Sequence, residues 1–192
     1  MAMRGEHWFR RCIHLCTPLF LFYYWMPSPL WSGGPEKIQG LFVILGIVYV
    51  FEAFRLSSKA RYPGMRHYEE TRLASYAWAA TGLAVLFLSV PVEIATPVVI
   101  GMAWVDPLIG EMRGRGNPDY PSVPMAIYFV LALTSMTYFY GPDIRVVVIA
   151  LVISPLAVWV EARRWWKLDD DFTMMVVPAA VAGVLAWIMG LI

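Results

Sequence analysis

The sequence predicts an all-α integral membrane protein that forms a single transmembrane helical domain over residues 1–192. Hydrophobic residues make up 59% of the chain, charged residues only 15%, and the mean hydropathy is +0.60. Soluble domains carry about 25% charged residues, and a chain of this length cannot bury so many apolar side chains in one core. The apolar residues also form nearly continuous runs, as in 41–51 and 146–160, whereas membrane β-strands alternate apolar and polar residues.

A helix that crosses a bilayer needs about 20 apolar residues, and the chain divides into about seven such segments. In order, we place them at 12–31, 37–54, 73–90, 92–105, 124–140, 143–160 and 173–192. No small-residue cleavage site follows the first, so we expect it to be retained rather than removed as a signal peptide. The fourth is short and carries Pro91, Glu93 and Pro97, which predicts a tilted or broken helix packed inside the protein.

The basic residues predict an orientation with the N-terminus in the cytoplasm. The cytoplasmic segments would then be 1–11, 55–72, 106–123 and 161–172, and they hold all of the fifteen basic residues except Lys37 and Arg145. This asymmetry is the pattern that the positive-inside rule describes. The sequence does not distinguish a cell membrane from an endoplasmic reticulum membrane, and it leaves open whether the chain forms oligomers.

The acidic residues collect on the same predicted face, where eleven of fourteen lie in or beside the cytoplasmic segments. Mixed carboxylates and cations suit a polyanionic ligand bound with a divalent metal. The alternative is that short loops are the only wet places available to any charge. A net charge of +1 gives no general attraction to nucleic acid, and two cysteines cannot form a disulfide scaffold.

The segment 106–123 has the composition of a loop that binds nucleotide phosphates. Asp106 lies at its start, where we expect the fourth helix to leave the membrane. Glycines permit close approach of backbone amides and arginines offer forked donors to phosphate; these residues are Gly110, Arg113, Gly114, Arg115 and Gly116. The segment is not a P-loop. An ordinary glycine-rich turn is the alternative.

The segment 161–173 contains Glu161 and three consecutive aspartates, Asp169 to Asp171. Adjacent carboxylates at the mouth of a membrane helix repel one another and need a compensating cation. Mg²⁺ commonly binds one or two carboxylates together with substrate phosphates, so Asp170 with Asp169 or Asp106 would suffice. The alternative is a solvated acidic cap at the start of the last helix.

Two ionisable residues inside predicted membrane segments are notable, because such residues are functional hypotheses. His14 lies in the first segment, close to Arg11, and Glu52 lies near the end of the second with Arg55 three residues later. Residues three apart share a helix face. His14 as a hydrogen-bonded helix contact, and Glu52 with Arg55 as a structural pair, are the alternatives.

Taken in order, these motifs resemble the polyprenol kinase family, which includes dolichol kinase, phytol kinase and CTP-dependent diacylglycerol kinase. Arg10-Arg11-Cys12-Ile13-His14 resembles the opening element of that family, Glu52 and Arg55 its Glu-x-x-Arg, and Glu69, Glu70 and Arg72 its basic loop. Asp106 resembles the start of the nucleotide loop. Glu161 followed by Asp169-Asp170-Asp171-Phe172-Thr173 is similar to the late element, a Glu and then Asp-Asp-Asn-x-Thr.

The sequence departs from the family pattern in two places. Residues 120–125 lack the Lys and Glu of the Lys-Ser/Thr-x-Glu-Gly-Ser element that normally follows the nucleotide loop, and Asp171 stands where the family has Asn. The first departure concerns the preference for CTP as donor. Arg113 and Arg115 are candidates to take over its phosphate contacts.

The resemblance implies transfer of the γ-phosphoryl group of CTP, with Mg²⁺ as cofactor, to a membrane isoprenoid alcohol at the cytoplasmic interface. It assigns Asp106 and Asp170 to the metal, Arg113 and Arg115 to phosphate, Glu161 to support of the site, and His14 or Asp169 to the alcohol. Arg11, Glu52, Arg55, Glu70 and Arg72 would orient substrate or hold the structure. Two alternatives remain: a CTP-dependent lipid-phosphate cytidylyltransferase, and a non-catalytic membrane protein or small transporter.

Overall fold

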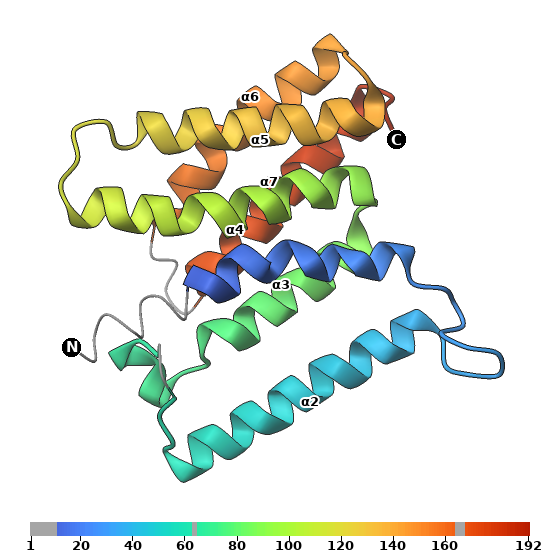
Figure 1. Cartoon of the computed structure of the whole chain (residues 1–192), viewed down its shortest axis with the longest axis vertical. Helices are drawn as coiled ribbons and strands as arrows, with labels where there is room; N and C mark the ends of the chain where they lie inside the picture. The colour runs from blue at the N-terminus through green and yellow to red at the C-terminus, as the bar shows by residue number, and fades with distance from the viewer. Residues whose placement is uncertain (1–10, 63–64, 164–167) are drawn as a thin grey trace.

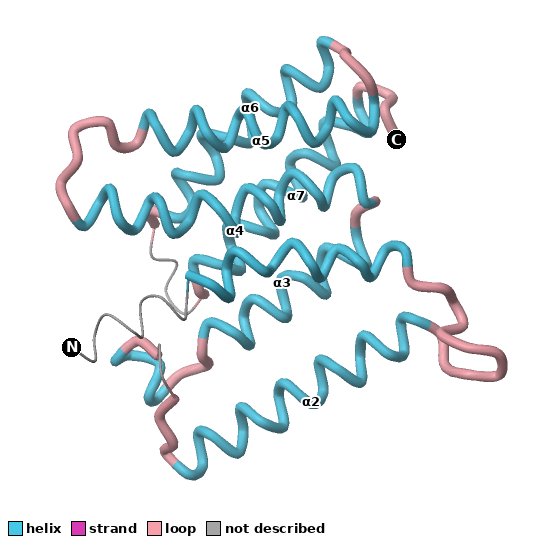
Figure 2. Tube along the Cα trace, viewed as in Figure 1, coloured by secondary structure: helices cyan, strands magenta, loops and turns pink. Residues whose placement is uncertain are grey.

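The computed structural model describes residues 11–62, 65–163 and 168–192, and every regular element among them is helical (Figures 1 and 2). A helix over 11–16 continues as the 3-10 helix η1 (Thr17–Trp25). The remaining elements are α2 (Lys37–Ser58), η2 (His67–Thr71), α3 (Ser75–Ser89), α4 (Val92–Gly114), α5 (Ser122–Tyr140), α6 (Ile144–Glu161) and α7 (Asp170–Ile188).

Within the described residues, five helices are long and apolar enough to cross a membrane, namely α2, α4, α5, α6 and α7, and α3 is a shorter apolar helix. The chain is therefore an all-helical membrane protein, as the composition predicts. Five of the seven predicted segments agree with observed helices to within four residues at each end, namely those that correspond to α2, α3, α5, α6 and α7. The first ends early, at Trp25 rather than residue 31, because Pro27 and Pro29 disfavour helical backbone at the residues before them.

The prediction for α4 is wrong in two respects. It is not short or broken but the longest of the helices described, and it contains both Pro97 and Pro107. It also continues to Gly114, so most of the predicted loop 106–123 is helical. Proline is tolerated in membrane helices because neighbouring groups satisfy the freed backbone. Beyond Pro107, Ile109 and Met112 are buried, and this packing extends the helix past the charged residues.

The core lies between α4, α5, α6 and α7. Its central side chains are fully buried, among them Val98, Val99, Tyr128 and Ile153. Gly101 faces the ring of Tyr128, and a β-carbon at this position would overlap that ring. A small residue here allows α4 and α5 to approach closely, as is typical of helix packing in membranes. This core fixes α4 and α7, the two helices that carry most of the acidic residues discussed below.

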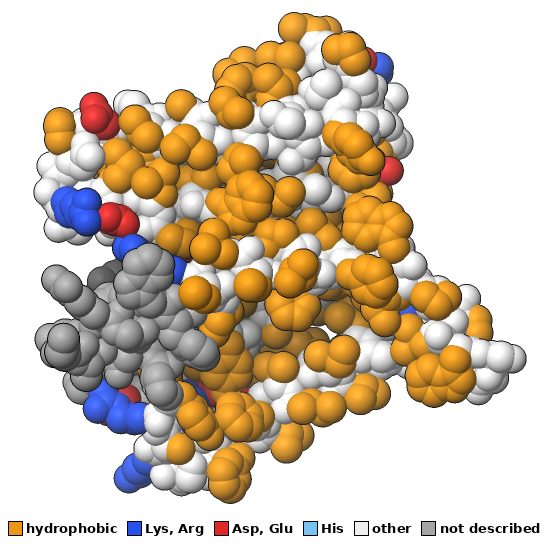
Figure 3. All heavy atoms as spheres, viewed as in Figure 1, with side chains coloured by type: hydrophobic (Ala, Val, Ile, Leu, Met, Phe, Trp, Pro, Cys, Tyr) orange, Lys and Arg blue, Asp and Glu red, His pale blue; other side chains and the backbone are white. Residues whose placement is uncertain are grey.

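Helix α2 lies at the edge of the fold. Only 11% of its apolar stretch is buried inside the molecule, compared with 61% for α4. It packs against α3, where the hydroxyl groups of Tyr49 and Thr81 lie 2.8 Å apart. In Figure 1 the helix runs along one side of the bundle, and Figure 3 shows hydrophobic side chains along it.

The segments that join α2 to α3 and α4 to α5 lie at the same end of the bundle as the start of the described chain, on the left in Figure 1. The C-terminus and the segments that join α3 to α4 and α5 to α6 lie at the opposite end. In Figure 3 lysine, arginine, aspartate and glutamate side chains gather at the left end. The predicted cytoplasmic segments 55–72 and 106–123 therefore lie at one end of the molecule. The described part of 161–172 lies there too, since Glu161 and Asp170 approach Asp106. Most of 1–11 lies outside the described residues.

Candidate functional site

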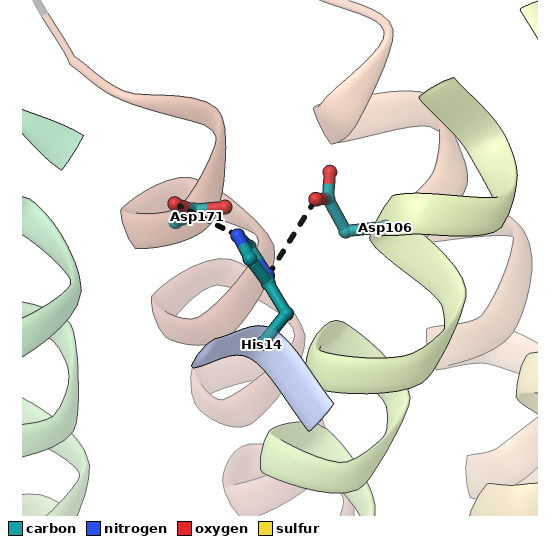
Figure 4. Close-up of side chains that lie close together, drawn as sticks. All are labelled: His14, Asp106 and Asp171. Carbon is teal, nitrogen blue, oxygen red and sulfur yellow. Dashed lines mark ion pairs between the residues drawn. The ribbon is translucent and has the colours of Figure 1, made fainter. Parts of the chain in front are cut away.

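Three buried side chains from distant parts of the sequence meet at the charged end of the bundle (Figure 4). His14 comes from the N-terminal helix, Asp106 from α4 and Asp171 from the first turn of α7. The Nδ1 atom of His14 lies 3.7 Å from Oδ2 of Asp106, and Nε2 lies 3.9 Å from Oδ2 of Asp171. The imidazole therefore lies between two carboxylates.

Two further groups of three carboxylates extend this group into a larger set, here called the carboxylate cluster. Asp106, Glu161 and Asp170 offer oxygen atoms within 4.8 Å of one another, and so do Asp169, Asp170 and Asp171. Helix geometry explains the convergence. Glu161 is the last residue of α6, and Asp169 caps α7 by accepting a 3.2 Å hydrogen bond from the backbone N–H of Asp171. The first turn of a helix also favours negative charge.

Two arginines pair with the carboxylate cluster from its rim. Arg66, in the segment before η2, donates to both carboxylate oxygens of Asp170 at 3.1 and 3.0 Å. Arg113, at the end of α4, donates to both oxygens of Glu161 at 2.9 and 2.7 Å. The side chain of Glu161 is 1% exposed, while that of Arg113 is 46% exposed. Each arginine thus reaches from solvent to a buried or half-buried acid.

The carboxylates of this site outnumber the basic side chains that the described part of the chain pairs with them. Among the described residues, five carboxylates are paired with two arginines and one histidine. Burial, followed by repulsion from Asp170, raises the pKa of Asp169 to about 7, and Arg66 opposes this shift only in part. Near neutral pH this carboxyl group is therefore about half protonated, and a cation bound nearby would favour release of its proton.

The donor set fits a divalent cation. Mg²⁺ prefers oxygen ligands about 2.0–2.1 Å away and usually keeps several waters, so oxygens on opposite sides of one ion lie about 4 Å apart. The oxygens of Asp106, Glu161 and Asp170 lie within 4.8 Å of one another. At most one pair of the three can be opposite, and neighbouring ligands of an octahedral ion lie about 2.9 Å apart, so these side chains would have to close around the ion. Exposed acidic groups are common without a metal, but Asp106 and Glu161 are buried.

Glu52 and Arg55 form a separate pair that is fully enclosed. Their side chains are 1% and 0% exposed, and Arg55 donates to Glu52 at 2.7 and 2.6 Å. Glu52 also accepts from the backbone N–H of Ala74 at 2.7 Å and from the hydroxyl of Tyr76, while Arg55 donates to the carbonyl of Arg72 at 2.7 Å. These bonds fasten the segment before α3 to the end of α2.

The predicted nucleotide-binding residues are dispersed in the structure. Gly110 and Gly114 lie within α4, and only Gly116 occupies a turn, with φ of 60°. Arg115 pairs with Glu111 at 2.6 Å, and Arg11 pairs with the other oxygen of Glu111 at 2.8 Å. Of the predicted phosphate ligands, the structure places only Arg113 in contact with the carboxylate cluster.

The other predicted orienting residues hold the α2–α3 connection. Glu70 pairs with Arg61 at the surface, and Arg72 contributes its backbone carbonyl to Arg55. Arg10, which carries part of the family resemblance, lies outside the described residues. None of these contacts places Glu70 or Arg72 beside the carboxylate cluster.

Sequence reasoning missed Arg66, Asp171 and Glu69 as residues of this site. Glu69 is buried and accepts hydrogen bonds from the backbone N–H groups of Arg66 at 2.7 Å and Ser75 at 3.1 Å. It thereby positions the segment from which Arg66 reaches Asp170. No local spacing signals this arrangement, because the partners are 104 residues apart. For Asp171, the run of three aspartates was a signal that could have been used.

A cavity of about 310 Å³ adjoins the carboxylate cluster. His14 and Asp171 lie on its wall together with residues of the N-terminal helix, α2, α3 and α4. Most of the remaining wall is apolar, including Ile13, Phe51, Ala79 and Met102. The arrangement can accommodate an apolar ligand that presents a polar group to His14.

The fold and site together define a helical membrane protein with a carboxylate-rich centre at one end and an apolar cavity beside it. No protein-family model matches the sequence, and comparison with curated proteins and with solved structures gives no match.

Proposed function

We propose that the protein is a Mg²⁺-dependent kinase that transfers the γ-phosphoryl group of CTP to the hydroxyl of a membrane isoprenoid alcohol. One observation carries this proposal. His14 lies between Asp106 and Asp171, and both His14 and Asp171 also line the wall of an apolar cavity. A lipid alcohol in the cavity would present its hydroxyl to the centre where a charged phosphate donor binds. The choice of CTP comes from the resemblance to polyprenol kinases.

The proposal includes seven membrane crossings, with the N-terminus and the active face in the cytoplasm. The five long helices supply five crossings, and α3 and the segment 11–25 supply two. A 3-10 helix rises about 2.0 Å per residue, so 11–25 extends about 27 Å, close to the ~30 Å hydrocarbon core. The distribution of basic residues supports the orientation. The membrane would be the cell membrane or that of the endoplasmic reticulum.

Asp106 and Asp170 would hold Mg²⁺, with Glu161 beside them. When bound, the ion neutralises charge on the β- and γ-phosphates of the donor. Arg66 and Arg113 are suited to the phosphate oxygens, because each presents a forked pair of donors to a carboxylate and reaches into solvent. Phosphate oxygens can replace carboxylate oxygens as acceptors for the same guanidinium groups.

His14 would accept the proton of the alcohol. The alcohol oxygen forms a bond to the γ-phosphorus, the bond from that phosphorus to the bridging oxygen breaks, and CDP leaves with the electron pair. The sequence leaves His14 and Asp169 as candidates for this role. The position of His14 supports this choice, because it lines the cavity and lies between the carboxylates of Asp106 and Asp171.

The test is an incubation of purified protein in lipid nanodiscs with a prenol, Mg²⁺ and CTP labelled at either the α- or the γ-phosphate. The proposal expects γ-label in the lipid product and CDP in solution. Label from the α-phosphate in the lipid, with release of pyrophosphate, would instead identify a cytidylyltransferase. If neither label enters any lipid, both enzymatic hypotheses fail, which leaves the third alternative, a non-catalytic membrane protein or small transporter.

A further inference from the structure

The cavity beside His14 has a polar inner wall and an apolar outer wall. His14 and Asp171 form part of the inner wall, at the carboxylate cluster. Phe51 of α2, Tyr62, Ala79 of α3 and Met102 of α4 contribute to the apolar remainder. Other polar residues on the wall have structural bonds: Glu69 accepts from the backbone N–H of Ser75. A ligand with one polar end and an apolar body matches this division.

The outer wall belongs to the loosely packed edge of the fold. The rings of Phe51 and Tyr62 lie 5.3 Å apart, and these residues are 44% and 38% exposed. Figure 3 shows hydrophobic side chains over α2 and over the neighbouring face of the bundle. Since this face of α2 is apolar and lies in the membrane, the cavity can receive a ligand sideways from the lipid.

The volume of the cavity limits what it can hold. A water-sized group occupies about 30 Å³, and a methylene group is of similar size. A cavity of about 310 Å³ therefore holds about ten such groups, which corresponds to two isoprene units. A glycerol lipid has two acyl chains next to its hydroxyl and would require both to enter.

We propose that this cavity is the acceptor subsite of the kinase and that it selects single-chain lipid alcohols by reading only the first two isoprene-sized units. This inference rests on the proposed function and adds a selection rule to it. The rest of the chain lies outside the cavity in the bilayer. Turnover then depends little on total chain length and falls strongly for alcohols with two acyl chains.

The first experiment measures binding without catalysis. Wild-type protein in phosphatidylcholine nanodiscs, without nucleotide, is irradiated with a single-chain prenol that carries a diazirine within its first two isoprene units. The expected labelled residues are those of the outer wall, such as Phe51 and Tyr62. An unlabelled prenol should compete and diacylglycerol should not. Labelling spread over the lipid-facing surface, or equal competition by diacylglycerol, overturns the subsite.

The second experiment uses a matched pair of substitutions on α3. Ala79→Phe fills the cavity, whereas Ala80→Phe makes the same change at the next residue, which is not part of the wall. We expect Ala79→Phe to weaken prenol labelling and phosphorylation about tenfold or more, as changes in pocket shape commonly do, and Ala80→Phe to leave both unchanged. Equal effects of the two variants contradict the assignment.

A third variant guards against misfolding of Ala79→Phe. Phe51→Ala removes a half-exposed ring from the outer wall, and we expect it to increase phosphorylation of diacylglycerol relative to a prenol by about tenfold. No change in this ratio contradicts the selection rule. If the wild type phosphorylates no lipid at all, the proposed function fails, while the labelling pattern still decides whether the cavity binds a single-chain alcohol. If a prenol is phosphorylated but no cavity residue is labelled, the proposed function stands and the assignment of the cavity as acceptor subsite fails.

Discussion

Two groups of carboxylates and arginines lie at the same end of this molecule, and they differ in how completely each charge is matched. The Glu52–Arg55 pair is fully enclosed, one acid to one base, and its remaining hydrogen bonds go to the α2–α3 connection. In the carboxylate cluster, acids outnumber the described arginines that pair with them, and Arg66 and Arg113 are 32% and 46% exposed. A matched, sealed pair holds structure, whereas an unbalanced cluster with accessible arginines can exchange partners.

The largest expected effect is a loss of phosphoryl transfer when His14, which lies at the carboxylate cluster, is replaced. We expect His14→Asn to lower the rate of γ-phosphoryl transfer about 10³-fold, within the range typical of a lost general base. Binding of Mg²⁺ and nucleotide should change little, because Asn removes no carboxylate. Single-turnover transfer and equilibrium nucleotide binding measure the two effects. A variant that transfers phosphate at the wild-type rate removes His14 from the chemistry.

The next effect concerns the sealed pair. Arg55→Met leaves the carboxylate of Glu52 buried without its cation, and breaking such a pair costs about 3–5 kcal/mol. The measurement is the free energy of unfolding in detergent micelles, with Arg61→Met as a control because that arginine is exposed. Unchanged stability in Arg55→Met would show that the pair does not hold the fold.

A smaller effect tests the arginines at the rim. Arg113→Ala should raise the KM for nucleotide about tenfold, because Arg113 reaches Glu161 at the centre. Arg115→Ala should raise it by less than about twofold, since its side chain is 76% exposed and pairs with Glu111. The sequence predicts the same role for both arginines, contact with phosphate. Equal changes in KM would instead support the prediction that Arg113 and Arg115 both bind phosphate.

The smallest effect tests how α2 is held. Tyr49→Phe removes the hydroxyl that faces Thr81, and interhelical hydrogen bonds in membranes contribute about 0.6 kcal/mol on average. The expected result is a loss of stability of that size, measured by unfolding, with faster proteolysis near α2. A loss of several kcal/mol would mean that α2 is bound more tightly than its packing indicates.

The sequence predicts much of the fold, because hydropathy reports directly on membrane helices. Its main error, at α4, arises where proline and charge within a helix give the pattern of a loop, while the burial of Ile109 and Met112 maintains the helix. That contribution depends on the neighbouring helices and leaves no local signal.

The candidate site was predicted in part. His14, Asp106, Glu161, Asp169 and Asp170 are brought together by the fold, and each stands out in sequence as an ionisable group in or beside a membrane segment. Arg66 could not be found in this way. Its contact with Asp170 depends on the segment that Glu69 holds in place, and a surface arginine in a basic segment has no distinguishing pattern.

The most direct test of the difference between the two groups is a measurement of cation binding. Mn²⁺, which prefers the same oxygen ligands as Mg²⁺, can be titrated into the wild type, Asp106→Asn and Asp119→Asn in nanodiscs and followed by electron paramagnetic resonance. Asp119 is exposed in the α4–α5 connection at the same end, so its variant carries the same change of charge. We predict one bound ion in the wild type and in Asp119→Asn, and its loss in Asp106→Asn. Equal binding by all three proteins would contradict the account.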